Sequence, residues 1–454
     1  MTSPVNTREK AHLMIKEPPT RFTEKLKFLG PGFILSASIV GSGELIATTT
    51  LGAEAGFVTF WVILVSCLVK VAIQLEYGKH AIHSGETVME AFNKLPGLRL
   101  GKAHWTIWSY LLMMAGKFLQ VGGIIGGVAI TMNIAFPQIP ISYFAFIVAI
   151  LVSLLVFRGH YRFIEGFSLL LIGLFTLFTF ACLIFLQYTS YAITSADILE
   201  GLTFNLPAGA VGVAIAAFGL TGVGGDEVMF YNYWCLEKGY GAYTGPREDS
   251  PEWANRARGW INVMYLDAFL AMLLYTLVTA AFYLLGAAVL HASGDIPEGY
   301  EMINTLSRMY TESLGPWAKS VFLIGAVIVL FSTLFSALAS WVRIFGDALG
   351  EVGWVDFHTP ESKSKVLAVQ AWLIPLVWAI LFLFIKQPVF MVLTGGVITS
   401  LILFLVVYAA VYFRYKRLPK ALEPGIFYNI AFWTSVLAII WVGVYGLFKL
   451  FLEV

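Results

Sequence analysis

Two short sequences place glycines and acidic residues inside segments that are otherwise strongly apolar. The first reads Val-Gly-Ser-Gly-Glu at positions 40–44, and the second reads Val-Gly-Gly-Asp-Glu at positions 223–227. A charged side chain at the centre of a membrane helix costs at least about 2.5 to 3.5 kcal/mol, so it normally faces a cavity or a partner. Glycine weakens a helix and lets its backbone open towards a ligand. The pattern predicts two broken helices that face each other across a substrate site.

Three carboxylates, those of Glu44, Asp226 and Glu227, are the candidate metal ligands at these breaks. Together with backbone carbonyls freed near Gly41 and Gly225, they would form a hard oxygen site suited to Mg²⁺, Ca²⁺ or Mn²⁺. We therefore expect these five residues to bind the substrate. In the alternative, Lys70 or Lys117 neutralises Glu227 or Glu44 in a buried ion pair, and that acid binds no substrate.

Two lysines lie within apolar segments, where a charged side chain is costly unless it has a partner or faces a cavity. Lys117 has Gln120 one turn along the same helical face, and Lys70 lies in an earlier segment. A buried lysine can carry a proton, replace a bound cation, or serve as a fixed counter-charge for a carboxylate. The sequence leaves these coupling and counter-charge roles open.

Other polar residues in apolar segments are candidates for supporting roles. Asp267 is expected to hold the ligand residues in position or to take part in gating. Ser332 and Thr333 can add hydroxyl ligands, although such residues also serve ordinary helix packing.

The composition indicates an all-α polytopic membrane protein. Of 454 residues, 58% are hydrophobic and 13% are charged, and the mean hydropathy is +0.79. A net charge of +1 offers no footprint for nucleic acid. Three cysteines in apolar segments indicate neither a disulfide framework nor a cysteine-rich metal site. No ATP-binding loop, zinc motif or nucleophile motif is present, so we expect no enzyme and no cofactor other than a transported cation.

The apolar runs predict eleven spans of a length that crosses the hydrocarbon core. They lie at about 29–52, 56–78, 105–134, 140–157, 164–188, 208–236, 260–290, 317–342, 366–386, 388–413 and 425–451. With a cytoplasmic amino terminus, 23 of the 29 Lys and Arg residues fall on the cytoplasmic side and four fall outside. The positive-inside rule therefore predicts an inside amino terminus and an outside carboxyl terminus in the cell's inner membrane.

The two glycine-acid motifs lie on the first and sixth predicted spans, so they have opposite orientations. Two inverted repeats of five helices, each opening with an interrupted helix, indicate a transporter with its site at the repeat interface. We expect a cytoplasmic tail over 1–27 and a transporter domain over 28–454. Within that domain we expect one repeat at about 28–190, a second at about 206–414 and an extra helix at about 425–451.

Several sequences are similar to those of a known family. Phe-Leu-Gly-Pro-Gly-Phe at 28–33 and Gly-Ala-Glu-Ala-Gly-Phe at 52–57 resemble the opening of Nramp-family divalent metal transporters. Arg-Phe-Ile-Glu at 162–165 is similar to their connector between helices four and five. The resemblance runs from about residue 28 to the end. It implies a LeuT-type 5+5 inverted-repeat fold with an eleventh helix, alternating access, and a metal held between unwound parts of helices one and six.

The ligand motifs depart from that pattern. The family's Asp-Pro-Gly-Asn is replaced by Gly-Ser-Gly-Glu at 41–44, and its Met-Pro-His aligns with Gly-Asp-Glu at 225–227. The Asp and Glu that the family associates with proton movement align with Lys117 and Gln120. Loss of the thioether and gain of carboxylates favour harder cations.

The leading hypothesis is a secondary transporter or facilitator of divalent cations, with Mg²⁺ or Mn²⁺ favoured over Fe²⁺ and with proton coupling doubtful. The alternative is a proton-coupled carrier of an organic solute such as an amino acid, with Lys117 in place of a coupling ion. A sensor that binds without translocating is a third reading. The expected partners are the transported cation or small solute and the lipid bilayer, with no nucleic acid, and the expected state is a monomer.

Overall fold

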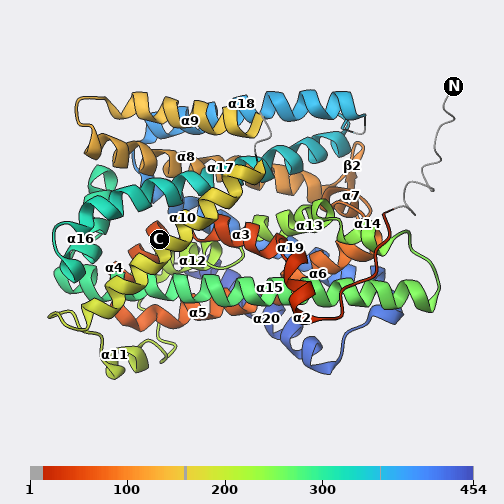
Figure 1. The fold of residues 1–454 in the computed structure, drawn as a ribbon, viewed down its shortest axis with the longest axis horizontal. Helices are drawn as coiled ribbons and strands as arrows, with labels where there is room; N and C mark the ends of the chain where they lie inside the picture. Colours follow the sequence, from red (N-terminus) through yellow and green to blue (C-terminus); the bar gives the residue numbers. More distant parts are fainter. Residues whose placement is uncertain (1–13, 158–160, 358, 453–454) are drawn as a thin grey trace.

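The computed structural model describes residues 14–157, 161–357 and 359–452, and most of them lie in long helices aligned with the long axis of the molecule (Figure 1). The long and membrane-core helices are α3 (Pro31–Ile39), α4 (Thr49–Ala55), α5 (Phe60–Val69), α6 (Val71–Ser84), α8 (Trp105–Ala135), α9 (Ile141–Phe157), α10 (Tyr161–Leu186), α12 (Val211–Leu220), α13 (Gly225–Lys238), α15 (Pro251–Leu285), α17 (Ala318–Val352), α18 (Pro360–Ile385), α19 (Pro388–Tyr412) and α20 (Ile426–Leu452). The connecting elements are α2 (Phe22–Lys25), α7 (Val88–Asn93), α11 (Ser195–Glu200), α14 (Tyr240–Thr244), α16 (Met302–Leu314) and the hairpin of β1 (Arg99–Leu100) and β2 (Ala103–His104).

Each predicted span has a helix or a pair of helices at its position, although fewer segments qualify as separate spans. Across the described ranges, eight helical stretches are long and apolar enough to cross a membrane, and α9 and Ile172–Leu186 are shorter apolar helices. The count falls by one because a single stretch, Gly43–Ser84, runs through the second half of the first predicted span and all of the second, and by two more because the fourth and fifth predicted spans are these shorter helices. The chain is an integral membrane protein by these criteria.

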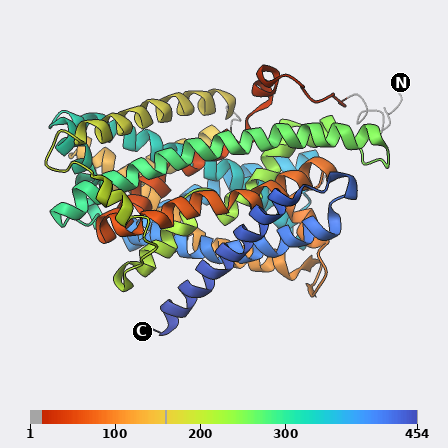
Figure 2. The same cartoon turned by 90° about the horizontal axis from the view of Figure 1, so that it is seen from below.

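The connector sequence at 162–165 lies in α10, but its side chains are outside the described residues, as is the structure of 1–13 in the predicted tail. α20 runs from the end of the molecule that carries α14 towards the end that carries α11 (Figure 2).

The two predicted helix breaks are present and touch each other. α3 ends at Ile39, and a π-helical segment, Gly43–Thr48, resumes the path after the break. α12 ends at Leu220, and Gly222 then adopts a φ of +61°, which a glycine tolerates without strain. A Cβ added to Gly43 would lie 3.2 Å from the carbonyl oxygen of Leu220, so the first break packs directly against the second.

Small residues let the helices behind the breaks approach closely. A Cβ on Gly219 of α12 would lie 2.0 Å from the carbonyl oxygen of Gly396 on α19, and a Cβ on Gly123 of α8 would lie 2.6 Å from that of Pro388. Backbone contacts of this kind are the usual means of helix association in a membrane, where lipid removes the hydrophobic drive between helices. α8, α12 and α19 therefore form a tight support for the second break.

An acidic residue outside the spans ties three basic side chains together. The carboxylate of Glu86 lies 3.1 Å from Nε2 of His80, 2.7 Å from Nζ of Lys94 and 3.2 Å from Nη2 of Arg417. The hydrogen bond with His80, aided by the two cations, lowers the pKa of Glu86 from its ordinary value of 4.5 to about 2. The network joins α6 to the segment after α19.

We expect Glu86→Gln to lower the melting temperature at neutral pH by a few degrees, because the neutral amide loses the charge-assisted contacts. A lowered folded-state pKa contributes stability that is fully present above the unfolded value of about 4.5 and is lost as the pH falls towards about 2. The difference between wild type and variant should therefore shrink below pH 4.5. Thermal unfolding in detergent from pH 7 down to pH 3.5 measures it, and a difference independent of pH would contradict the assignment.

Candidate functional site

Glu44 lies at the first break with its carboxylate satisfied by neutral donors. The backbone N–H of Gly41 donates to Oε2 at 3.2 Å, and the hydroxyl of Thr279 on α15 donates to Oε1 at 3.0 Å. The side chain is fully buried in the first turn of Gly43–Thr48, where the positive end of the helix dipole favours an acid. Within the described chain, Glu44 forms no ion pair.

Asp226 lies in the first turn of α13 and is paired with Lys117. The ammonium of Lys117, on α8, is 2.9 Å from Oδ1 of Asp226 and donates to the hydroxyl of Thr399 on α19 at 2.7 Å. Both charged side chains are about 97% buried or more. In this structure Lys117 is thus a counter-charge for Asp226, one of the roles that the sequence left open.

Glu227 follows on the same first turn but has no basic partner within ion-pair distance among the described residues. Its Oε2 lies over Gly224, where an added Cβ would be only 2.2 Å from it. The side chain is partly exposed, whereas Glu44 and Asp226 are buried. Of the three predicted carboxylates, Glu227 is therefore the one that is both uncompensated by a cation and accessible.

Lys70 forms no ion pair with a carboxylate of the described residues and instead binds backbone carbonyls at the second break. Its Nζ donates to the carbonyl oxygens of Phe218 at 2.7 Å and Thr221 at 2.5 Å. The side chain is fully buried, so it does not reach towards the membrane surface. The structure therefore gives Lys70 a different contact from the counter-charge role expected beside an acid.

Two glycines that were expected at the substrate also allow close packing of helices. A Cβ on Gly225 would meet Cγ2 of Ile402 at 2.8 Å, so this residue lets α13 approach α19. A Cβ on Gly41 would lie 1.7 Å from Oγ1 of Thr333, which brings α17 against the first break. Thr333 therefore contacts the first break, and the neighbouring Ser332 is buried.

Gly41→Ala is expected to destabilise the protein by about 1 to 3 kcal/mol, because overpacking forces neighbouring groups to shift. Adding Thr333→Ala removes the clashing hydroxyl and should recover most of the loss. Gly212→Ala on α12 is the matched control, since a Cβ there meets nothing within 4 Å. Melting temperatures of the four proteins in detergent provide the measurement, and equal loss with and without Thr333→Ala would refute the contact.

Gln120 and Asp267 form no hydrogen bond with Glu44, Asp226 or Glu227 among the described residues. Gln120 packs against Gly395, where a Cβ would be 2.2 Å away, and its Oε1 is buried without a hydrogen bond in the described structure. Asp267 accepts hydrogen bonds from the backbone N–H groups of Gly30 at 2.8 Å and Gly32 at 2.5 Å. It therefore clamps the start of α3, which fits a gating role better than support of a ligand.

Sequence reasoning missed the hydroxyl groups that complete this region. Thr279 donates to Glu44, and Thr399 accepts from Lys117. The hydroxyl of Ser66 donates to the two carbonyl oxygens that hold Lys70, and the hydroxyl of Thr221 donates to Ser66. Their spacing along the chain carries no signal, because single hydroxyl residues are common in membrane helices. Only the packing of helices distant in sequence reveals them.

The described part of the chain contains no group of three or more His, Cys, Asp or Glu side chains arranged to hold a metal ion. The three predicted ligands consequently do not converge on one point in this conformation. Asp226 is held by Lys117, and Glu44 is held by its own break and α15.

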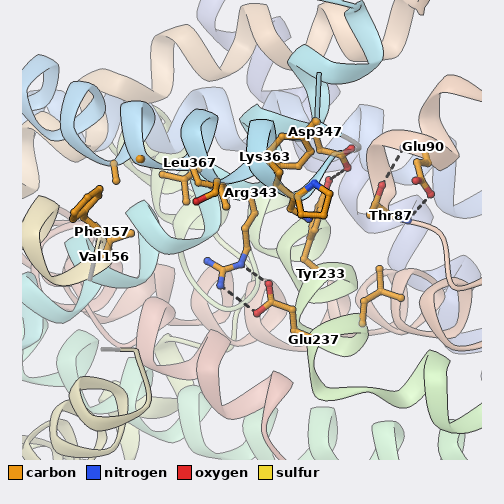
Figure 3. Close-up of a pocket in the computed structure, with 17 residues that line it drawn as sticks. Thr87, Glu90, Val156, Phe157, Tyr233, Glu237, Arg343, Asp347, Lys363 and Leu367 are labelled. Carbon is orange, nitrogen blue, oxygen red and sulfur yellow. Dashed lines mark hydrogen bonds and ion pairs between the residues drawn. The ribbon is translucent and has the colours of Figure 1, made fainter. Parts of the chain in front are cut away.

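A polar cavity of about 910 Å³ opens further along α13 (Figure 3). Tyr233 and Glu237 line it from α13, seven and eleven residues beyond Asp226 and so on the same helical face, about 10 to 16 Å along the axis. Arg343 of α17 pairs with Glu237 across the cavity, and the hydroxyl of Tyr233 donates to Asp347 at 2.5 Å. Four polar side chains, those of Tyr233, Glu237, Arg343 and Asp347, therefore line the cavity beyond the second break.

Residues 32–449 match the family profile described as "Natural resistance-associated macrophage protein-like", Nramp. The chain is 27% identical over 326 residues to the divalent metal cation transporter MntH of Xanthomonas campestris, covering 71% of this chain and 69% of that protein. A mutant of the Eremococcus coleocola manganese transporter superposes with a TM-score of 0.57 at 13% identity, covering 96% of this chain and 97% of that one. MhsT in complex with L-phenylalanine gives 0.59 at 16% identity, covering 96% and 100%. At such identities the structural likeness concerns the fold.

Proposed function

The chain belongs to the Nramp family and has its LeuT-type fold, and from that premise we propose that it moves divalent metal cations across the membrane by alternating access. Family membership identifies a transporter and not an enzyme. The observation that carries the proposal is Glu227, a partly exposed carboxylate without a basic partner in the described structure, at a helix break that touches the break of Glu44.

Glu44 and Glu227 are the proposed carboxylate ligands, and Asp226 stays paired with Lys117 during binding. A movement that brings the two breaks' acids together would complete the site, with backbone carbonyls as further donors. Carboxylate and carbonyl oxygens favour Mg²⁺ or Mn²⁺ over Fe²⁺. Lys117 and Gln120 stand where the family has acids, which supports transport that is independent of the proton gradient.

The cavity beside Tyr233 and Glu237 is the proposed cytoplasmic exit. Its position beyond the cytoplasmic half of the sixth helix follows from the distribution of basic residues, which supports a cytoplasmic amino terminus and an outside carboxyl terminus in the inner membrane. The two glycine-acid motifs support a division of the proposed transporter domain into repeats at about 28–190 and 206–414 with an extra helix. The proposed state is a monomer. The Arg343–Glu237 pair would then open to release the cation.

Uptake into proteoliposomes tests the proposal. Purified protein should carry Mg²⁺ and Mn²⁺ down a concentration gradient with the same rate whether or not a pH gradient is imposed. Uptake no faster than in protein-free vesicles for both metals would overturn it.

A second candidate, a carrier of an organic solute such as an amino acid, is favoured by one observation. Lys70, which forms no ion pair with a described carboxylate, places an ammonium group beside the second break, where it would repel a divalent cation and attract a substrate carboxylate. Thermal stabilisation by metals and by amino acids in the same preparation separates the two, because each ligand stabilises the fold that binds it.

A further inference from the structure

The Lys70 ammonium is bound by two backbone carbonyl oxygens rather than by an acid. Nζ is 2.7 Å from the carbonyl oxygen of Phe218 and 2.5 Å from that of Thr221, and no carboxylate of the described chain lies within 4 Å of it. The side chain is fully buried, and the ring of Phe218 lies 5.0 Å away, within the range of a cation–π contact. A buried cation without an ion-pair partner needs such dipoles to be stable.

The second break supplies both carbonyl oxygens. α12 ends at Leu220, so its last carbonyls lack helical partners and carry the negative end of the helix dipole. The hydroxyl of Ser66 donates to the same two carbonyl oxygens at 2.9 and 3.0 Å, and the hydroxyl of Thr221 donates to Ser66 at 2.7 Å. Two carbonyl oxygens thus face the ammonium, and one hydroxyl donates to both of them. Carbonyl oxygens of this kind are ligands of small hard cations.

We propose that Lys70 is a tethered cation that permanently fills a cation-binding site at the carbonyl end of α12. In a chain without this ammonium, the same oxygens would bind a small monovalent cation or an amine. The second break of this protein therefore carries its positive charge covalently and needs no dissolved cation to hold its shape. The inference concerns the break itself and does not depend on which substrate is carried.

Lys70→Ala empties the site while leaving its oxygens in place, and Lys70→Met removes the charge but fills the space. We expect both variants to lose stability in choline buffer. Propylammonium matches the atoms that Lys70→Ala removes, so it should restore at least half of the lost melting temperature of that variant, with a smaller gain from Na⁺ or K⁺ at equal ionic strength. Lys70→Met and wild type should not respond.

Thermal unfolding in detergent provides the measurement, and it uses no transport. If Lys70→Ala does not fold in choline, it is purified in propylammonium throughout, and folding only with the amine supports the proposal. Absence of rescue, or equal rescue of Lys70→Met, would show that Lys70 only fills space and caps α12. Loss of divalent uptake by wild-type protein would bear on the proposed function and leave this result unaffected.

Discussion

Replacing Glu44 and Glu227 together by glutamine is expected to lower Mg²⁺ and Mn²⁺ uptake into proteoliposomes at least tenfold. Each substitution keeps the side chain's size and removes one negative charge from a break where no basic side chain of the described structure neutralises it. A tenfold loss of affinity corresponds to about 1.4 kcal/mol, which is small beside the attraction between a carboxylate and a divalent ion in contact. The single Glu227→Gln variant should show most of the effect, because Glu227 is the accessible acid of the pair.

The matched control removes the same charge from the surface. Glu252 and Glu361 are exposed, and replacing both by glutamine should leave uptake unchanged. A double Glu44 and Glu227 variant that folds and transports at the wild-type rate would exclude these carboxylates as ligands. Melting temperatures of all variants separate a loss of transport from a loss of folded protein.

Breaking the Lys117–Asp226 pair is expected to have the largest effect on stability. Removing one partner of a buried pair leaves an uncompensated charge and typically costs about 3 to 5 kcal/mol. Lys117→Met and Asp226→Asn should therefore each lower the melting temperature strongly, since both side chains are almost completely buried. The double variant should be closer to wild type than either single variant, because it leaves no buried charge.

The double-mutant cycle supplies its own control. Equal and additive losses would show that the two residues act independently and would contradict the pair. The Asp226 single variant carries a second expectation, since it leaves the ammonium of Lys117 unpaired. An unpaired Lys117 about 6 Å from a divalent ion would cost on the order of 5 kcal/mol at an effective dielectric near 20, and the pairing with Asp226 cancels much of that repulsion.

The amino-acid sequence by itself determined the membrane architecture, the two helix breaks and the family. Long apolar runs can be satisfied only as helices in a membrane, because each backbone group must find its partner within the segment. Glycines beside acids at 40–44 and 223–227 then identify the breaks, since an acid in lipid demands a special environment. These properties are local, so they can be derived without knowing which helices are neighbours.

Only the tertiary structure decided which charge meets which group. Lys117 and Asp226 are 109 residues apart, and Lys70 binds carbonyls 148 and 151 residues away. No periodicity links such positions, so the sequence could not distinguish a lysine paired with an acid from one held by a helix end. The packing of α8 and α13 against α19, and of α12 against α5, brings these partners together. Of the three predicted carboxylate ligands, it leaves Glu44 and Glu227 without an ion pair to any described basic side chain.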